Sequence, residues 1–123
     1  MREQALSMLY ESVKDRVRMA RDEFAAVFDG WNVYPLTQRG EVIGAFVECA
    51  GEVHVGYGVK PAGSILRQIK GIFTPLLKEQ GELRTKVDEA NARGLEFCRR
   101  LGFQEVRREG GIVFMRCERC NYA

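Results

Sequence analysis

The sequence has little of what marks metal-binding, membrane or secreted proteins. Its 123 residues include one histidine, one tryptophan and four cysteines. No apolar run approaches the roughly 20 residues that a membrane span needs. The beginning of the chain, MREQALSMLYESVKDR, carries too many charges for a secretory signal. We therefore expect a cytoplasmic protein whose cysteines are reduced.

Two of the cysteines, Cys117 and Cys120, form a C-x-x-C pair of the kind used in zinc and redox sites. A structural zinc site needs four ligands, which usually come from two such pairs. The chain has no second pair, and its only histidine is His54. We therefore expect two incidental thiols and no metal site, and a metal or redox role of the pair is the alternative.

Charge is divided unevenly along the chain. Residues 1–59 hold 6 Lys and Arg against 9 Asp and Glu, whereas residues 60–123 hold 13 against 8. A basic half suits an anionic ligand or partner, and a solvated mixed surface is the plain alternative. A nucleic-acid partner is not expected, because the aromatic platform of a single-strand binder is not evident. The arginines that would favour such a partner are Arg99, Arg100, Arg107, Arg108, Arg116 and Arg119.

The first half of the chain alternates between helical and strand patterns. Apolar residues spaced by three and four predict a helix over 2–28 that Gly30 ends, long enough to contain a break. Three antiparallel strands are then predicted at 31–36, 42–49 and 53–59, joined by short turns. This is a meander of neighbouring strands.

The second half of the chain adds a crossover and a hairpin. A helix is predicted at 65–80, which Pro75 should kink or divide, followed by a strand at 82–87. Asp88 is the expected N-cap of a helix that ends at Gly102. A hairpin turns at Gly110 and Gly111 and completes a mixed, mostly antiparallel sheet in a single α/β (α+β) domain over 1–123.

The third strand has one face bared by glycine, because Gly56 and Gly58 follow His54 at every second position. Such a face lets a bulky ligand group or another backbone come close, and close packing of a helix is the alternative. The strand leads through Lys60 and the small residues 61–64 into a helix that carries Arg67. A loop of this kind at a helix N-terminus suits an anion, because the first helical N–H groups have no partner within the helix.

The segment NARGLEFCRRLGF, residues 91–103, resembles the GNAT superfamily of acyl-CoA-dependent N-acyltransferases. Members of that family commonly read N-x-x-A-x-x-(L/F)-Y-x-x-x-G-F at this place. The V-x-P at Val59 and Pro61 resembles the family's approach to its pyrophosphate loop. The resemblance covers about residues 31–117 and implies a GNAT-like sheet with helices on both faces. The family's first strand is missing here, or a partner chain covers that edge of the sheet.

The resemblance implies an N-acetyltransferase that takes its acetyl group from acetyl-CoA and passes it to a small-molecule or protein amine. The pyrophosphate of coenzyme A would rest on Gly63, Ser64 and Ile65, with Lys60 and Arg67 beside it. The pantetheine arm would bond to the strand at Tyr57 and Val59, and Asn91 would support it. Among these residues only Gly63 is a glycine, whereas the family loop usually has two.

The same resemblance implies roles in proton transfer. His54 or Glu52 would be the base, near the third strand. Cys98 stands where the family usually has the tyrosine that protonates the departing thiolate, and Tyr57 and Tyr122 are other donors. The alternative is a non-catalytic GNAT-fold protein that serves in structure or assembly. Short chains of this kind resemble bacteriophage proteins, so a virion component or a homo-oligomer would fit that reading.

Overall fold

The computed structural model describes residues 1–118 of the chain. These residues divide into two compact units, which are described separately. Unit 1 contains Met1–Cys49 and His54–Ile69, and unit 2 contains Ala50–Val53 and the described residues from Lys70 onward. The expectation of a single domain over 1–123 stays a prediction.

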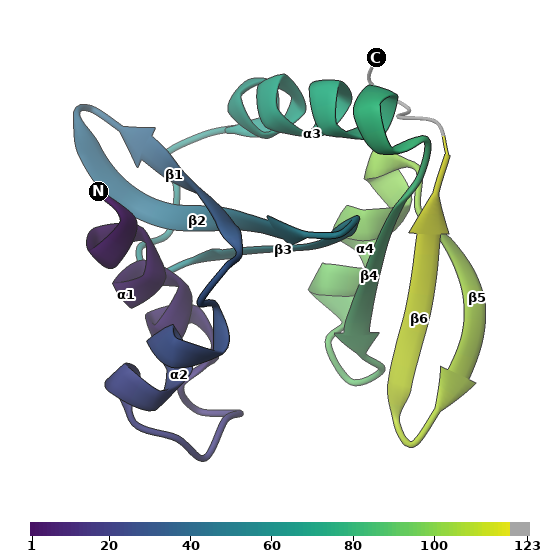
Figure 1. The fold of residues 1–123 in the computed structure, drawn as a ribbon, viewed down its shortest axis with the longest axis horizontal. Helices are drawn as coiled ribbons and strands as arrows, with labels where there is room; N and C mark the ends of the chain where they lie inside the picture. Colours follow the sequence, from purple (N-terminus) through teal and green to yellow (C-terminus); the bar gives the residue numbers. More distant parts are fainter. Residues whose placement is uncertain (119–123) are drawn as a thin grey trace. The chain divides into compact units, whose positions relative to one another are not determined.

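The described residues form four helices and six strands (Figure 1). The helices are α1 (Arg2–Val13), α2 (Arg21–Val27), α3 (Leu66–Gln80) and α4 (Ala92–Leu101). The strands are β1 (Asn32–Gln38), β2 (Glu41–Cys49), β3 (Glu52–Tyr57), β4 (Leu83–Asp88), β5 (Gln104–Glu109) and β6 (Ile112–Cys117). The sheet has the order β1-β2-β3-β4-β6-β5 and is mostly antiparallel, with β3 and β4 parallel. The predicted fold class is therefore confirmed.

The helix expected over 2–28 is two helices, α1 and α2. The apolar stripe continues through both, but the chain turns back between Lys14 and Ala20. The turn is held by Tyr10, whose hydroxyl donates to the Met19 carbonyl at 2.9 Å. Folding back lets Leu9 of α1 and Phe24 of α2 enter one buried cluster with Val47 of β2, which a single straight helix could not do.

A charged side chain joins the two helices at the end of α2. Arg2 donates to the carbonyls of Phe28 and Trp31, at 2.6 and 2.8 Å. The last carbonyls of a helix lack partners within the helix, and a cation favours that negative end of the dipole. Arg2 therefore fixes the start of α1 against the end of α2.

Gly56 of β3 and Gly58, just after the strand, lie beneath α1. A Cβ added at Gly56 would lie against Ser12 Oγ and within 2.8 Å of Leu9 Cδ1, and one at Gly58 would lie 3.0 Å from the Met8 backbone. The face that these glycines bare is thus filled by a helix of the same unit. The expectation that the glycines make room for a ligand arm is wrong for this face, and the alternative of close helix packing is confirmed.

Unit 2 includes the first residues of β3, which pair with β4. Glu52 is paired with Arg84, and Thr85 Oγ1 donates to the Val53 carbonyl at 2.7 Å. The expected parallel crossover is confirmed. α3 runs through Pro75 as one helix, so the proline does not divide it. Its Phe73 is fully buried and lies edge-to-face with Phe103 at 5.7 Å.

The helix that carries the quoted motif begins later than expected. Its N-cap is Asn91, whose side chain accepts a hydrogen bond from Gly94 N at 3.0 Å. Asp88 instead ends β4 and accepts from Ala90 N, so the N-cap prediction at Asp88 is wrong. Gly102, with φ 116°, ends α4 as expected, because only glycine adopts this conformation readily.

The glycine packing of β3 gives a stability prediction. Gly56→Ala should destabilise the protein by about 1–3 kcal/mol, because the added methyl group overpacks the contact with Ser12 and Leu9. Gly71→Ala is the matched control, since Gly71 lies exposed on α3 with open space around it. That change should stabilise the helix by up to about 1 kcal/mol. Urea unfolding would measure both, and an undiminished stability of Gly56→Ala would contradict the packing of α1 on β3.

Candidate anion site at the β3–α3 loop

The loop between β3 and α3 carries most of the predicted cofactor residues, and all of these except the buried Ile65 are exposed. Gly63 has φ 86°, and no atom lies within 4 Å of where its Cβ would be. Ser64 Oγ accepts from Leu66 N at 3.2 Å. Within residues 1–118, the N–H groups of Gly63, Ser64 and Ile65 have no hydrogen-bond partner. Three consecutive backbone donors therefore precede the first turn of α3.

Two cationic side chains flank these donors. Lys60 precedes the loop and Arg67 lies in the first turn of α3, and both are exposed. Neither makes an ion pair with the part of the chain that is described. The loop thus combines backbone donors, a helix N-terminus and positive charge, which together suit an anion.

Two glutamines that the sequence did not single out hold this loop to β1. Gln38, the last residue of β1, bonds both backbone groups of Ala62. Gln68, in the first turn of α3, bonds both backbone groups of Thr37. These contacts join residues 24 and 31 positions apart, so no local pattern could have indicated them.

His54 lies at the end of a series of aromatic rings in unit 1. Its imidazole is 6.0 Å from the Trp31 ring, which is 5.1 Å from Phe28. Phe24 and Tyr10 continue the series at 5.1 and 5.4 Å. The predicted base therefore lies near the only tryptophan of the chain, a neighbour that sequence spacing did not suggest.

The second predicted base, Glu52, lies in unit 2 and has a basic neighbour. Its carboxylate is 4.0 Å from Lys86 Nζ. Both side chains are partly exposed, and a role of Glu52 as a base would compete with this contact.

The predicted proton donors are both partly buried. Burial raises the pKa of the Cys98 thiol from 9.0 to about 11, against a smaller opposing effect of Arg99. Burial also raises the pKa of Tyr57 to about 12, and its ring lies over Gly44 of β2. Both side chains thus hold their protons at neutral pH. Tyr122 lies outside the described residues.

The two remaining predicted cofactor residues are Val59 and Asn91, and they differ in how many contacts they make within the chain. Val59 is 52% exposed at the beginning of the loop. Asn91 uses its side-chain oxygen to cap α4, which leaves its amide nitrogen as the group for any ligand. Their cofactor contacts stay predictions.

The predicted site residues are divided between the two units. Unit 1 contains His54, Tyr57, Val59, Lys60, Gly63, Ser64, Ile65 and Arg67. Unit 2 contains Glu52, Asn91 and Cys98. The anion-binding part of the predicted site therefore belongs to one unit.

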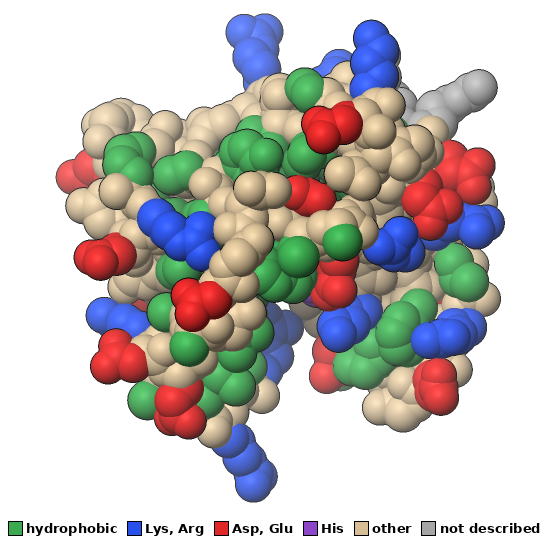
Figure 2. Space-filling model, in the orientation of Figure 1, with side chains coloured by type: hydrophobic (Ala, Val, Ile, Leu, Met, Phe, Trp, Pro, Cys, Tyr) green, Lys and Arg blue, Asp and Glu red, His purple; other side chains and the backbone are tan. Residues whose placement is uncertain are grey.

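The arginines of the second half are largely neutralised by neighbouring carboxylates. Arg108 contacts Glu105 at 2.9 Å and Glu89 at 3.8 Å, and Arg100 contacts Glu96 at 3.4 Å. Figure 2 shows acidic and basic side chains interspersed on this face of the molecule. Such a surface does not form the single-sign field that attracts nucleic acid. Arg119 lies outside the described residues.

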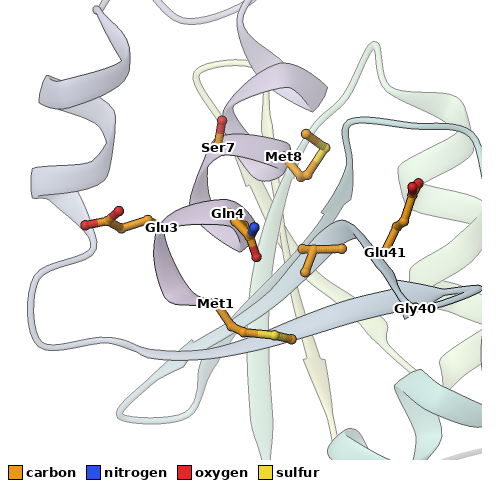
Figure 3. Close-up of a pocket in the computed structure, with 8 residues that line it drawn as sticks. Met1, Glu3, Gln4, Ser7, Met8, Gly40 and Glu41 are labelled. Carbon is orange, nitrogen blue, oxygen red and sulfur yellow. The ribbon is translucent and has the colours of Figure 1, made fainter.

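A shallow hollow of about 540 Å³ lies between α1 and the turn before β2. Met1, Gln4 and Met8 project from α1 on this side, whereas Glu3 points away (Figure 3). Its other lining residues are Ser7, Gly40, Glu41 and Val42. No residue of the predicted site lines this hollow, and most of its lining side chains are solvent-exposed.

Residues 1–118 also bear on metal binding and membrane insertion. No three side chains of His, Cys, Asp or Glu gather there in a way that could hold a metal ion. Cys117 is buried, and Cys120, its partner in the C-x-x-C pair, lies outside the described residues. None of the helices in this part of the chain has both the length and the apolar character that crossing a membrane requires.

Comparison with known proteins gives a structural likeness only. No family model matches the chain, and no curated protein matches it. The fold is similar to the crystal structure of the PaiA N-acetyltransferase from Thermoplasma acidophilum in complex with coenzyme A. The TM-score is 0.63 and the identity is 12%, over 96% of this chain and 90% of that chain. The chain has a GNAT-like fold. At this identity the likeness extends to the fold alone.

The buried thiol of Cys98 gives a pH prediction. At pH 8 its thiolate fraction should be roughly a hundredfold lower in the folded protein than in the unfolded chain, because of the raised pKa. Iodoacetamide should therefore modify Cys98 much more slowly in buffer than in urea, as measured by peptide mass spectrometry. Since ionisation of this thiol favours the unfolded chain, stability should also fall as the pH rises from about 9 to about 11. Equal alkylation rates would contradict the burial.

Proposed function

We propose that this chain binds coenzyme A at the β3–α3 loop and transfers an acetyl group from acetyl-CoA to an amine. The observation that carries the proposal is the run of three unpaired backbone donors at Gly63, Ser64 and Ile65, beside Lys60 and Arg67. The GNAT-like fold supports it, since the similar PaiA structure contains coenzyme A. The motif at residues 91–103 is a further, independent support.

The residues of the loop fit a pyrophosphate. Its oxygens need several donors, and the loop offers three N–H groups and two exposed cations. A glycine at 63 leaves the approach open, because no side chain projects there. Acetyl-CoA, when bound, supplies an acyl group activated as a thioester. The chain's own residues then have to orient the amine and manage one proton at each end of the transfer.

His54 is the better candidate for the base that takes a proton from the acceptor amine. An imidazole nitrogen can accept a proton from an amine, and the Trp31 ring is a neighbour of His54 at 6.0 Å. Glu52 is already paired with Lys86. A carboxylate in an ion pair is a weaker base, because the cation stabilises its charged form.

Cys98 is the proposed proton donor, and Tyr57 is the alternative. A donor must still carry its proton at the working pH, and the raised pKa values keep both groups protonated there. Cys98 occupies the helical position at which the family usually has a tyrosine. The assignment of the acid rests on that correspondence and on the burial of the thiol.

Ligand binding tests the first part of the proposal. Coenzyme A at 100 times its dissociation constant should stabilise the protein by about 2.7 kcal/mol in a thermal-shift assay. Lys60→Ala should weaken binding about tenfold, because it removes one charge-assisted contact. Lys78→Ala, an exposed lysine at the other end of α3, should bind as tightly as wild type. If millimolar coenzyme A produced no shift, the proposal would fail.

Substitution of the base tests the second part. With acetyl-CoA and a panel of amines, His54→Ala should lower kcat by about 10²–10⁴, the usual contribution of a general base. Glu52→Gln should lower it less, since Glu52 is held by Lys86. Release of free thiol measures kcat for each variant. A larger loss of kcat in Glu52→Gln than in His54→Ala would assign the role of the base to Glu52.

A non-catalytic GNAT-fold protein is the second candidate. It is favoured by the filling of the glycine face of β3 by α1 and by the single glycine of the loop. Such a protein would act in assembly, for example as a homo-oligomer or a bacteriophage virion component, rather than as a cytoplasmic enzyme. Size-exclusion chromatography with light scattering separates the two. A monomer that acetylates amines would exclude the second candidate.

A further inference from the structure

Two side-chain amides anchor the segment 62–68, which contains the end of the β3–α3 loop and the first residues of α3. Gln38 Oε1 accepts from Ala62 N at 2.8 Å, and Gln38 Nε2 donates to the Ala62 carbonyl at 3.2 Å. Gln68 Oε1 accepts from Thr37 N at 2.7 Å, and Gln68 Nε2 donates to the Thr37 carbonyl at 2.9 Å. Each amide therefore satisfies both backbone groups of one residue. We call these two contacts the glutamine clamps.

The three unpaired donors lie between the glutamine clamps. Gly63, Ser64 and Ile65 follow the anchored Ala62 and precede Gln68, so the segment is tied to neighbouring residues of β1 on both sides. A flexible loop loses conformational entropy when a ligand orders it. A loop that is ordered in advance avoids that loss at the moment of binding.

We propose that Gln38 and Gln68 are positioning residues that hold the β3–α3 loop ready for the pyrophosphate of coenzyme A. This inference rests on the proposed function. The clamps explain how a loop with a single glycine presents three consecutive donors. Within this loop only Gly63 has a positive φ, and the anchoring of 62 and 68 restricts the residues around it.

The chemistry of the clamps requires an amide. A backbone residue presents one donor and one acceptor, and a glutamine side chain matches both at once. A carboxylate could accept from Ala62 N but could not donate to the Ala62 carbonyl. Gln38→Glu, which preserves size and shape, should therefore break one hydrogen bond of the clamp and place a negative charge beside the anion site.

Calorimetric titration of coenzyme A into the folded variants tests the inference. Gln38→Ala should weaken binding about tenfold or more, with a less favourable binding entropy, because the ligand must now order the loop. Gln38→Glu should weaken it at least as much. Gln80→Ala, an exposed glutamine at the end of α3, is the matched control and should bind like wild type.

Amide hydrogen exchange in the ligand-free protein tests the clamp itself. Ala62 N–H should exchange slowly in wild type and in Gln80→Ala, and faster in Gln38→Ala. Circular dichroism at the titration temperature would confirm that each variant is folded. If Gln38→Ala failed to fold, Gln68→Ala, which removes the other clamp without adding a charge, would provide the comparison, with exchange measured at Thr37 N–H.

The outcomes separate this inference from the proposed function. If wild type failed to bind coenzyme A, the proposed function would be refuted. If wild type bound it and Gln38→Ala bound it equally well, only the inference would be refuted. Weaker binding of Gln38→Ala with an unchanged entropy, or unchanged exchange at Ala62, would also refute the ordering role. Weaker binding with a less favourable entropy and faster exchange would support it.

Discussion

The close approach of α1 to β3 is the contact on which unit 1 depends. Gly56 and Gly58 bring the helix near enough for Leu9 to reach the sheet. Burial of a leucine of this kind contributes about 1.5–3 kcal/mol. α2 then folds back onto the same cluster through Phe24, and Arg2 fixes the two helices together. A side chain at either glycine would hold α1 away and expose this shared core.

That packing also decides where a ligand can bind in unit 1. Because α1 fills the glycine face of β3, the space for an anion begins only where the strand ends and the chain enters the loop. There the backbone leaves the sheet and its N–H groups lose their strand partners. The two glutamines replace some of those partners and leave three donors unpaired. The candidate anion site is thus a consequence of how the strand ends, and its donors are backbone groups that need no particular side chain.

Local signals in the sequence predicted the parts of the fold that depend on local conformation. Gly102 ended α4 and Gly110 and Gly111 turned the last hairpin, because positive φ is costly for other residues. Asp88 and Asn91 both have side chains that can cap a helix. Asp88 is still part of β4, so Asn91 is the residue that caps α4. The break between α1 and α2 was not placed, since the apolar stripe continues across it. The position of this break is set by tertiary packing of α1 and α2.

The sequence predicted the backbone of the candidate site but not the side chains that contact its functional groups. The loop from Lys60 to Arg67 has a recognisable order of strand, small residues and helix. The neighbours of its functional groups come from distant parts of the chain, as with Trp31 beside His54 and Lys86 beside Glu52.

The Gln68 clamp has a second consequence at the sheet edge, because it occupies both backbone groups of Thr37. Pro35, two residues earlier on the same edge, has no N–H to offer. An added strand would therefore find β1 closed at two alternate positions, which disfavours pairing of a partner strand there.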